Sequence, residues 1–239
     1  MAMMPNPMLT DRFSRALDFA IVIHATQVRK GTCIPYVAHL LAVASLAIEH
    51  GADEDTAIAA LLHDAPEDRG GLPMLAQIRA RFGNDVAEIV EGCSDSFDED
   101  KAPYAMRKTN YVLHLAGDAS LETCLVSASD KLHNARAILH DLRATTDVRA
   151  FWSRFNSTPI LIGWYYGRVE QALTARLAGH DGREIVQEMA RALDAIAALP
   201  RCDGFASGLA LGRSGKACPE APLTPKAQAR WSTANEEKP

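Results

Sequence analysis

Apolar residues recur at helical rather than strand spacing along most of the chain. The first such stretch runs from Phe13 to Val28, where apolar positions lie three, four or seven residues apart. This spacing places the apolar side chains on one face of a helix, which can then pack against the rest of the protein. No segment shows the alternation of apolar and polar residues that a half-buried strand requires. The pattern therefore predicts an all-α protein.

Turn-forming and capping residues divide this pattern into separate helices. Glycines, prolines and capping aspartates mark the breaks between them. The expected helices span residues 11–30, 38–49, 73–82, 84–93, 103–115, 120–142, 151–177 and 183–199. One more helix, the third along the chain, is expected to start after residue 53 and to end near residue 64. Together they fit a single helical domain over residues 11–199, which is within the usual size of a domain. Residues 1–10 are expected to form an N-terminal extension.

The composition changes after Pro200. The last forty residues hold five of the twelve prolines and four of the fifteen glycines, with sparse apolar residues and no helical period. A segment of this kind buries too little apolar surface to offset the entropy lost on ordering. We therefore expect residues 200–239 to form a flexible tail, with docking of the tail onto the domain as the alternative.

Bulk composition narrows the class of protein. The 239 residues are 48% hydrophobic and 23% charged, which is typical of a globular protein. The net charge is -5 and the basic residues are scattered, so the sequence predicts binding to neither nucleic acid nor membranes. The five cysteines form no CxxC pair, and no signal peptide or membrane span is apparent. We expect a cytoplasmic protein, and its oligomeric state stays open.

A cluster of ionisable residues follows the apolar run that ends at residue 62. His63 and Asp64 come first, and Glu67 and Asp68 follow one helical turn later. Such groups lose hydration beside apolar surface, and a divalent cation compensates an imidazole together with carboxylates. Pro66 lies between the two pairs and should kink or end the helix there, because proline lacks the N–H that a helix needs. The cluster predicts a metal site.

Two further residues are candidate ligands of the same metal. His39 lies at the start of a helix whose other face is apolar, and Asp130 follows an apolar stretch that should lie in the core. Asn134 is four residues beyond Asp130, so it falls on the same helical face. Taken alone, His39 could be a core or capping histidine, and Asp130 could form a surface pair with Lys131.

The ordered set of these histidines and aspartates on predicted helices resembles the HD-domain superfamily of metal-dependent phosphohydrolases, whose pattern is H…HD…D. The segments that begin at Val28, Pro35, Leu61 and Ser129 are similar to the hydrolase domain of the RelA/SpoT enzymes. In that family the corresponding strings read approximately RK…PYxxH, LLHDxxED and xDKLxNxR. The similarity spans about residues 12–175. No later sequence is long enough for a synthetase domain, so the chain resembles a stand-alone small alarmone hydrolase.

The resemblance implies a helical-bundle hydrolase that binds one Mn²⁺ ion. Its implied ligands are His39, His63, Asp64 and Asp130. The implied reaction removes the 3′-diphosphate from ppGpp or pppGpp and yields GDP or GTP with pyrophosphate. Glu67 and Asp68 are the implied catalytic residues that handle the attacking water, and the sequence does not choose between them.

The resemblance also implies residues that bind the nucleotide. Arg29 is expected to stack on the purine, which suits a planar guanidinium, and Lys30 to contact phosphate. Asn134 is expected near the ribose or the reacting phosphate. Lys101, together with the basic pair at 107–108, could supply the remaining charge for the phosphates.

Three other functions remain open at this stage. The first is a related phosphohydrolase that acts on an adenine alarmone, a 5′-nucleotide or NADPH. The second is a nucleotide sensor that has lost catalysis. The third is a helical scaffold that binds no metal. Trp164, Tyr165 and Tyr166 lie at helical spacing with other apolar residues, and we assign them to the core.

Overall fold

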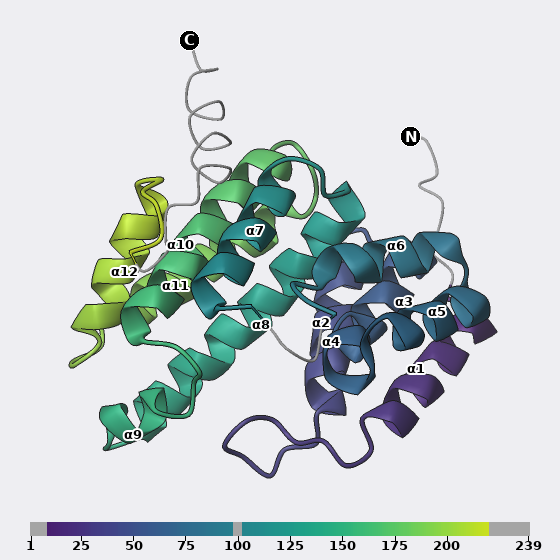
Figure 1. The fold of residues 1–239 in the computed structure, drawn as a ribbon, viewed down its shortest axis with the longest axis horizontal. Coiled ribbons are helices and arrows are strands. Elements are labelled where there is room, and N and C mark those ends of the chain that lie inside the picture. The colour runs from purple at the N-terminus through teal and green to yellow at the C-terminus, as the bar shows by residue number, and fades with distance from the viewer. Residues whose placement is uncertain (1–8, 98–101, 220–239) are drawn as a thin grey trace.

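The computed structural model describes residues 9–97 and 102–219, which form a bundle of helices (Figure 1). The helices are α1 (Asp11–Ile23), α2 (Val37–Glu49), α3 (Glu54–Leu62), α4 (Ala65–Arg69), α5 (Gly71–Phe82), α6 (Asn84–Cys93), α7 (Tyr104–Ala116), α8 (Leu121–Ala144), α9 (Val148–Trp152), α10 (Pro159–Arg176), α11 (Arg183–Ala197) and α12 (Asp203–Arg213). The predicted all-α class is confirmed. Over the described residues, none of these helices is both long enough and apolar enough to cross a bilayer.

The buried apolar residues form two clusters that are joined by α8. One cluster gathers side chains of α1 to α6, and the other gathers mainly those of α7 to α12. In Figure 1, α8 runs between the two groups of helices. Its Val126 packs in the first cluster, whereas Leu132 and Ile138 pack in the second. A side chain that lies midway along α8 is therefore placed between the two halves of the molecule.

The break between α3 and α4 follows from local sequence. The carboxylate of Asp53 accepts a hydrogen bond from the Thr56 N–H at 2.9 Å and so caps the start of α3. Pro66 lies in the first turn of α4, where a missing N–H breaks no helical hydrogen bond. The helix therefore ends at Leu62 and a new one starts, as the proline predicted. His63 lies at this junction.

The first helix is shorter than the sequence pattern indicated. It ends at Ile23, and the chain then forms the loop that leads to α2. Within this loop the Arg29 N–H donates to the Ile34 carbonyl at 2.8 Å, and Val28 bridges to Pro35 in antiparallel fashion. The prediction of a helix up to residue 30 is wrong, because these local backbone hydrogen bonds replace the helical ones.

A second difference concerns residues 151–177, which we expected to form one helix. The chain instead forms α9 and α10, separated by residues 153–158. Thr158 has an extended backbone and its hydroxyl accepts from the Leu161 N–H, so it caps α10. Pro159 explains the break, since the residue before a proline is disfavoured in the helical region.

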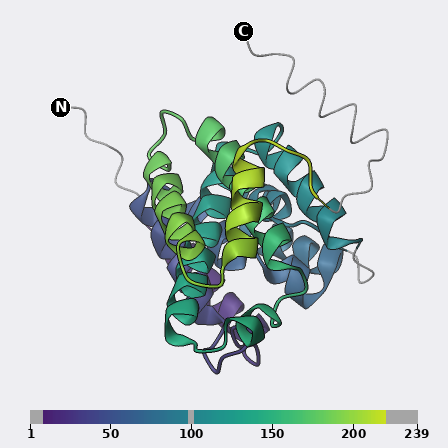
Figure 2. The ribbon, with the colours of Figure 1, turned by 90° about the vertical axis from the view of Figure 1, so that its left-hand side faces the viewer.

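The segment after residue 199 begins with an ordered helix. In Figure 2, α12 is the yellow-green helix near the viewer, with α11 beside it, and the side chain of Phe205 is fully buried. Glycines permit close approach: a Cβ atom added at Gly208 would lie 1.9 Å from the carbonyl oxygen of Ile160 in α10. The expectation of a flexible tail is therefore wrong for residues 203–213. The last part of that predicted tail, residues 220–239, lies outside the described residues.

Candidate active site

Three of the four predicted metal ligands converge in the interior. His39 comes from the first turn of α2, His63 from the end of α3, and Asp130 from the middle of α8. One ligand atom of each residue lies within 4.8 Å of the others. All three residues are buried. Helices distant in sequence thus bring two imidazoles and one carboxylate to a single point.

The fourth predicted ligand, Asp64, lies against the same point. Its Oδ2 atom is 3.0 Å from Nε2 of His63 and 3.4 Å from Nε2 of His39. On the other side, Oδ1 of Asp130 is 3.2 Å from the His39 Nε2 atom. Both imidazoles therefore face carboxylate oxygens.

The two buried Nε2 atoms provide a test of whether this set suits a cation. Neither the Nε2 atom of His39 nor that of His63 has a hydrogen-bond partner with acceptable geometry among the described residues. A buried polar atom without a partner destabilises the folded state unless something binds it. Two imidazole nitrogens and two carboxylate oxygens are ligands that a divalent transition metal accepts. The donor set fits a metal ion.

Neighbouring groups fix the orientation of two of these ligands. The Nδ1 atom of His63 lies 2.9 Å from the Ala60 carbonyl oxygen and donates its hydrogen there, so Nε2 is the atom that faces the carboxylates and that would ligate a metal once its proton is lost. The hydroxyl of Tyr36 donates to Oδ2 of Asp64 at 2.6 Å. Contacts of this kind hold metal ligands in place before a metal binds.

Charges in the cluster compensate one another. Burial alone would raise the pKa values of Asp64 and Asp130, but the neighbouring His63, His39 and, for Asp130, Lys131 hold both well below the usual range. Burial alone would lower the pKa of His63, but the two carboxylates raise it well above its ordinary value. The carboxylates are therefore ionised, and a cation that binds here must displace a proton from His63.

Glu67 lies on the side of the cluster that faces a small polar cavity. This cavity has a volume of about 180 Å³, and Glu67, Asp64 and Asp130 all line it. The Oε1 atom of Glu67 accepts a hydrogen bond from the Asp95 N–H at 2.7 Å. Burial and the charge of Asp95 raise the pKa of Glu67. A carboxylate with a raised pKa is a better proton acceptor near neutral pH.

Asp68, which the sequence paired with Glu67, has different surroundings. Its side chain is exposed, and Oδ2 accepts a hydrogen bond from the Gln27 side chain at 2.7 Å. It is not among the residues that line the small cavity. The turn at the start of α4 therefore separates the two acidic residues, and only Glu67 reaches the cavity.

A larger cavity of about 640 Å³ opens beside the cluster, and His39 forms part of its wall. This volume is in the range of pockets that hold small organic ligands. Five basic side chains line it: Arg29, Lys30, Lys108, Lys131 and Arg154. Asp141 is the one acidic residue among the described residues of this lining, so positive charge is in excess there and attracts anions.

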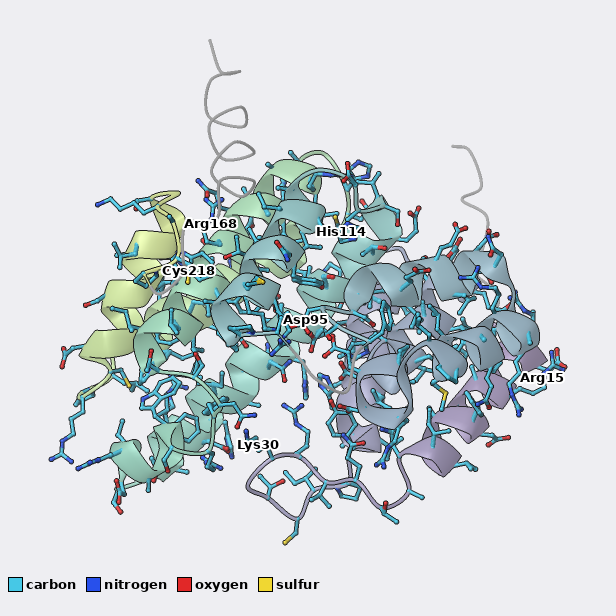
Figure 3. The ribbon with its side chains drawn as sticks, in the orientation of Figure 1. Arg15, Lys30, Asp95, His114, Arg168 and Cys218 are labelled. Atoms are coloured by element: carbon cyan, nitrogen blue, oxygen red, sulfur yellow. The ribbon has the colours of Figure 1, made fainter. Side chains whose placement is uncertain are left out.

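Three of the four predicted substrate residues line this cavity. Arg29 donates to Oδ1 of Asn134 at 2.8 Å, and its guanidinium carbon lies 6.0 Å from the centre of the Tyr36 ring. Lys30 lies on the loop between α1 and α2, where Figure 3 labels it. The loop that replaced the end of the predicted first helix thus directs both cations toward the cavity. Lys101 lies outside the described residues.

Sequence reasoning missed part of the basic wall. Lys131 had been considered only as a surface partner of Asp130, yet it is largely buried and its Nζ atom contacts that carboxylate. Lys108, by contrast, belongs to the basic pair that the sequence did suggest for the phosphates; it lines the cavity, is largely buried, and its Nζ atom lies 2.6 Å from Oδ2 of Asp95, which Figure 3 places near the centre of the molecule. Both ammonium groups lie over the ring of Tyr165, which belongs to the core and also lines the cavity. The signal in the sequence that could have identified Lys131 was its position directly after the predicted metal ligand Asp130.

Comparisons with known proteins identify similar sequences. A model of the HD domain family matches residues 16–151. The chain is 36% identical over 133 residues to a guanosine-3′,5′-bis(diphosphate) 3′-pyrophosphohydrolase of Aquifex aeolicus, a match that covers 55% of this chain and 18% of that protein. It is 37% identical over 124 residues to the guanosine-3′,5′-bis(diphosphate) 3′-pyrophosphohydrolase MESH1 of Xenopus tropicalis, with 51% of this chain and 66% of that one covered. The chain thus matches less than two thirds of the length of either relative.

A solved structure has a similar fold. It is described as a metazoan ortholog of SpoT that hydrolyzes ppGpp and plays a role in starvation responses. It superposes with a TM-score of 0.57 at 26% sequence identity, and the match covers 78% of this chain and 97% of that chain. The match extends over most of the helical bundle described above.

Proposed function

Because this chain belongs to the HD domain family, we propose that it is a manganese-dependent guanosine-3′,5′-bis(diphosphate) 3′-pyrophosphohydrolase that acts on ppGpp and pppGpp. The observation that carries this proposal is the position of the His39, His63 and Asp130 cluster at the edge of a basic cavity of about 640 Å³. A substrate with two diphosphate groups needs a cationic wall and an adjacent metal. The relatives named for this activity support the same conclusion.

In this proposal the metal is held by His39, His63, Asp64 and Asp130. Carboxylate ligands suit Mn²⁺, imidazole ligands suit divalent transition metals more generally, and four protein ligands would leave coordination positions for water and a phosphoryl oxygen. When bound, such a cation polarises the phosphoryl group and lowers the pKa of a water molecule.

Glu67 is the catalytic residue that we propose for proton transfer. It lines the small cavity beside Asp64 and Asp130, and its raised pKa suits a general base. Glu67 accepts a proton from the attacking water as the water oxygen bonds to the phosphorus of the 3′-diphosphate. The bond from phosphorus to the ribose O3′ breaks, O3′ takes up a proton, and pyrophosphate leaves. The other product is GDP from ppGpp or GTP from pppGpp.

The residues of the larger cavity bind the nucleotide in this proposal. Arg29 stacks on the purine through its planar guanidinium, while its hydrogen bond to Asn134 sets its position. Asn134 lies near the ribose or the reacting phosphate, because its side chain also contacts Asp130. Lys30 and Lys131 neutralise phosphate charge.

We further propose that the protein acts in the cytoplasm. All five cysteines are described by the structure and none forms a disulfide. Unpaired thiols are typical of proteins kept in a reducing compartment. The proposed substrate, a phosphorylated guanine nucleotide, fits this location.

A panel of nucleotides tests the proposed function. The purified chain is incubated with ppGpp, pppGpp, an adenine alarmone, 5′-nucleotides and NADPH, in parallel with Mn²⁺, Mg²⁺ and Zn²⁺, and the products are separated by chromatography. Release of pyrophosphate from ppGpp, with highest activity in Mn²⁺, is the expected result.

Other outcomes identify the alternatives. Release of orthophosphate from NADPH without turnover of ppGpp would show that NADPH, and not ppGpp, is the substrate. Binding of ppGpp without turnover in saturating Mn²⁺ would indicate a sensor. A chain that retains no metal by elemental analysis and binds none in titration would be a scaffold.

A further inference from the structure

A second histidine lies directly behind a proposed metal ligand. The Nδ1 atom of His133 is 2.8 Å from the Nδ1 atom of His39, and the ring centres are 4.9 Å apart. At this distance one nitrogen must carry a hydrogen and the other must offer a lone pair, because two N–H groups or two lone pairs would repel each other. The contact is therefore a hydrogen bond with a definite direction.

The position of His39 sets that direction. Its Nε2 atom faces the carboxylates of Asp64 and Asp130 at 3.4 and 3.2 Å, where the metal would bind. A ring nitrogen that ligates a metal uses its lone pair, so the hydrogen of the neutral His39 ring resides on Nδ1. With a metal bound at Nε2, His39 is consequently the donor and His133 the acceptor.

The second nitrogen of His133 then has a fixed role as well. When Nδ1 accepts a hydrogen bond, the neutral ring carries its own hydrogen on Nε2. His133 is partly exposed and lines the large cavity together with Arg29 and Asn134. Among the described residues, no side chain or backbone atom forms a hydrogen bond with this Nε2 atom. The N–H is thus available to a ligand in the cavity.

We infer that His133 is a positioning residue with two contacts: its Nδ1 accepts the hydrogen of His39, and its Nε2–H donates to an oxygen of the bound nucleotide. This inference rests on the proposed function for the identity of the ligand. A neutral donor beside the arginine and lysines selects an oxygen without adding charge. One ring thereby links the orientation of a metal ligand to the binding of substrate.

Two variants of His133 separate its two contacts. In His133→Asn, the amide oxygen can occupy the place of Nδ1 and accept from His39, but nothing replaces Nε2–H. This variant should keep its Mn²⁺ affinity within about threefold of the wild type, while KM for ppGpp rises about tenfold, the loss typical of one hydrogen bond. In His133→Phe, both contacts disappear. Its Mn²⁺ affinity should fall about 10- to 100-fold, and KM should also rise.

The metal measurement needs no substrate. Mn²⁺ affinity is measured by titration calorimetry on the metal-free full chain, and KM and kcat are measured with ppGpp in saturating Mn²⁺. His180→Asn is the matched control, because this exposed histidine lies in the turn between α10 and α11. Thermal unfolding of each variant, compared with the wild type, reports whether the fold is kept.

Each half of the inference has its own contrary result. Wild-type Mn²⁺ affinity in a folded His133→Phe protein would overturn the contact to His39. An unchanged KM in His133→Asn would overturn the donor role. Failure of the proposed function is distinguishable from both, since a wild type that binds Mn²⁺ but does not hydrolyse ppGpp still allows the metal titration to test His133.

Discussion

The phenolic hydroxyl of Tyr36 donates a hydrogen bond of 2.6 Å to Oδ2 of Asp64. This oxygen is the one that faces both imidazoles of the cluster, at 3.0 Å from His63 and 3.4 Å from His39. Tyr36 directly precedes α2, which carries His39 three residues later. One hydroxyl thus connects the start of α2 to the junction between α3 and α4, and it holds a carboxylate oxygen at the centre of the site.

Replacing Tyr36 by Phe removes this hydrogen bond but keeps the ring. The aromatic contact with His24, at 5.2 Å between ring centres, should remain. We expect the Mn²⁺ affinity to fall about 10- to 100-fold, as is usual when a group that orients a metal ligand is lost. Titration calorimetry on the metal-free protein measures the change. An affinity equal to that of the wild type would show that Asp64 holds its position without the hydroxyl.

The two acidic residues of α4 should respond differently to removal of charge. Glu67→Gln should lower kcat for ppGpp about 10²- to 10⁴-fold with Mn²⁺ affinity unchanged, because in the proposed function the residue transfers a proton and does not ligate the metal. Asp68→Asn is the matched control and should stay within about threefold of the wild type, since Asp68 is exposed and hydrogen-bonded to Gln27. Steady-state kinetics with ppGpp measures kcat for both variants. Equal losses of kcat would contradict the assignment of Glu67 alone.

Metal affinity should rise with pH. Burial opposes protonation of His63, but Asp64 and Asp130 outweigh it and raise its pKa well above the ordinary value. The metal must displace this proton, so below the raised pKa the affinity should increase by up to about tenfold per pH unit. Calorimetry in buffers of different ionisation enthalpy measures the protons released. Binding of Mn²⁺ without proton release, and with the same affinity at pH 6 and pH 8, would contradict this expectation.

The packing of α12 on α10 should depend on one glycine. In Gly208→Ala, the added Cβ atom would lie 1.9 Å from the Ile160 carbonyl oxygen, so the helices must separate. We expect the free energy of unfolding to fall by about 1–3 kcal/mol, the usual cost of overpacking. Gly204→Ala is the control, because its Cβ would meet Pro159 at an ordinary 3.5 Å. That change should be neutral or stabilising by about 0.5–1 kcal/mol, since alanine favours a helix.

Urea denaturation measures both values. Equal stability of the two glycine variants would show that α10 and α12 adjust without cost. Loss of stability in Gly208→Ala would confirm that α12 is an integral part of the bundle.

Local features of the sequence were sufficient to predict most helices. The pattern gave residues 84–93 as a helix, and α6 has the same bounds. The break at Pro66 was also correct, because the lack of an N–H is a property of proline itself. Signals of this kind act over one or two turns and need no knowledge of distant residues.

Predictions were wrong where other interactions outweighed the apolar period. Arg29 and Lys30 continue a helical pattern, but backbone hydrogen bonds across the loop to Ile34 replace the helix. The segment with Phe205 has many glycines and looked flexible, yet these glycines let it pack closely on α10. In the first case the interacting residue is several positions further along the chain, and in the second case it belongs to another helix.

The sequence by itself determined the all-α class and the residue types of the site, because helical period and the chemistry of His and Asp are local properties. Only the tertiary structure decided that Glu67 rather than Asp68 lines the small cavity, that Lys131 forms part of a basic wall, and that His133 contacts His39. These relations depend on how α2, α3, α4 and α8 pack, and the positions of helices far apart in the chain are set by the shared core between them.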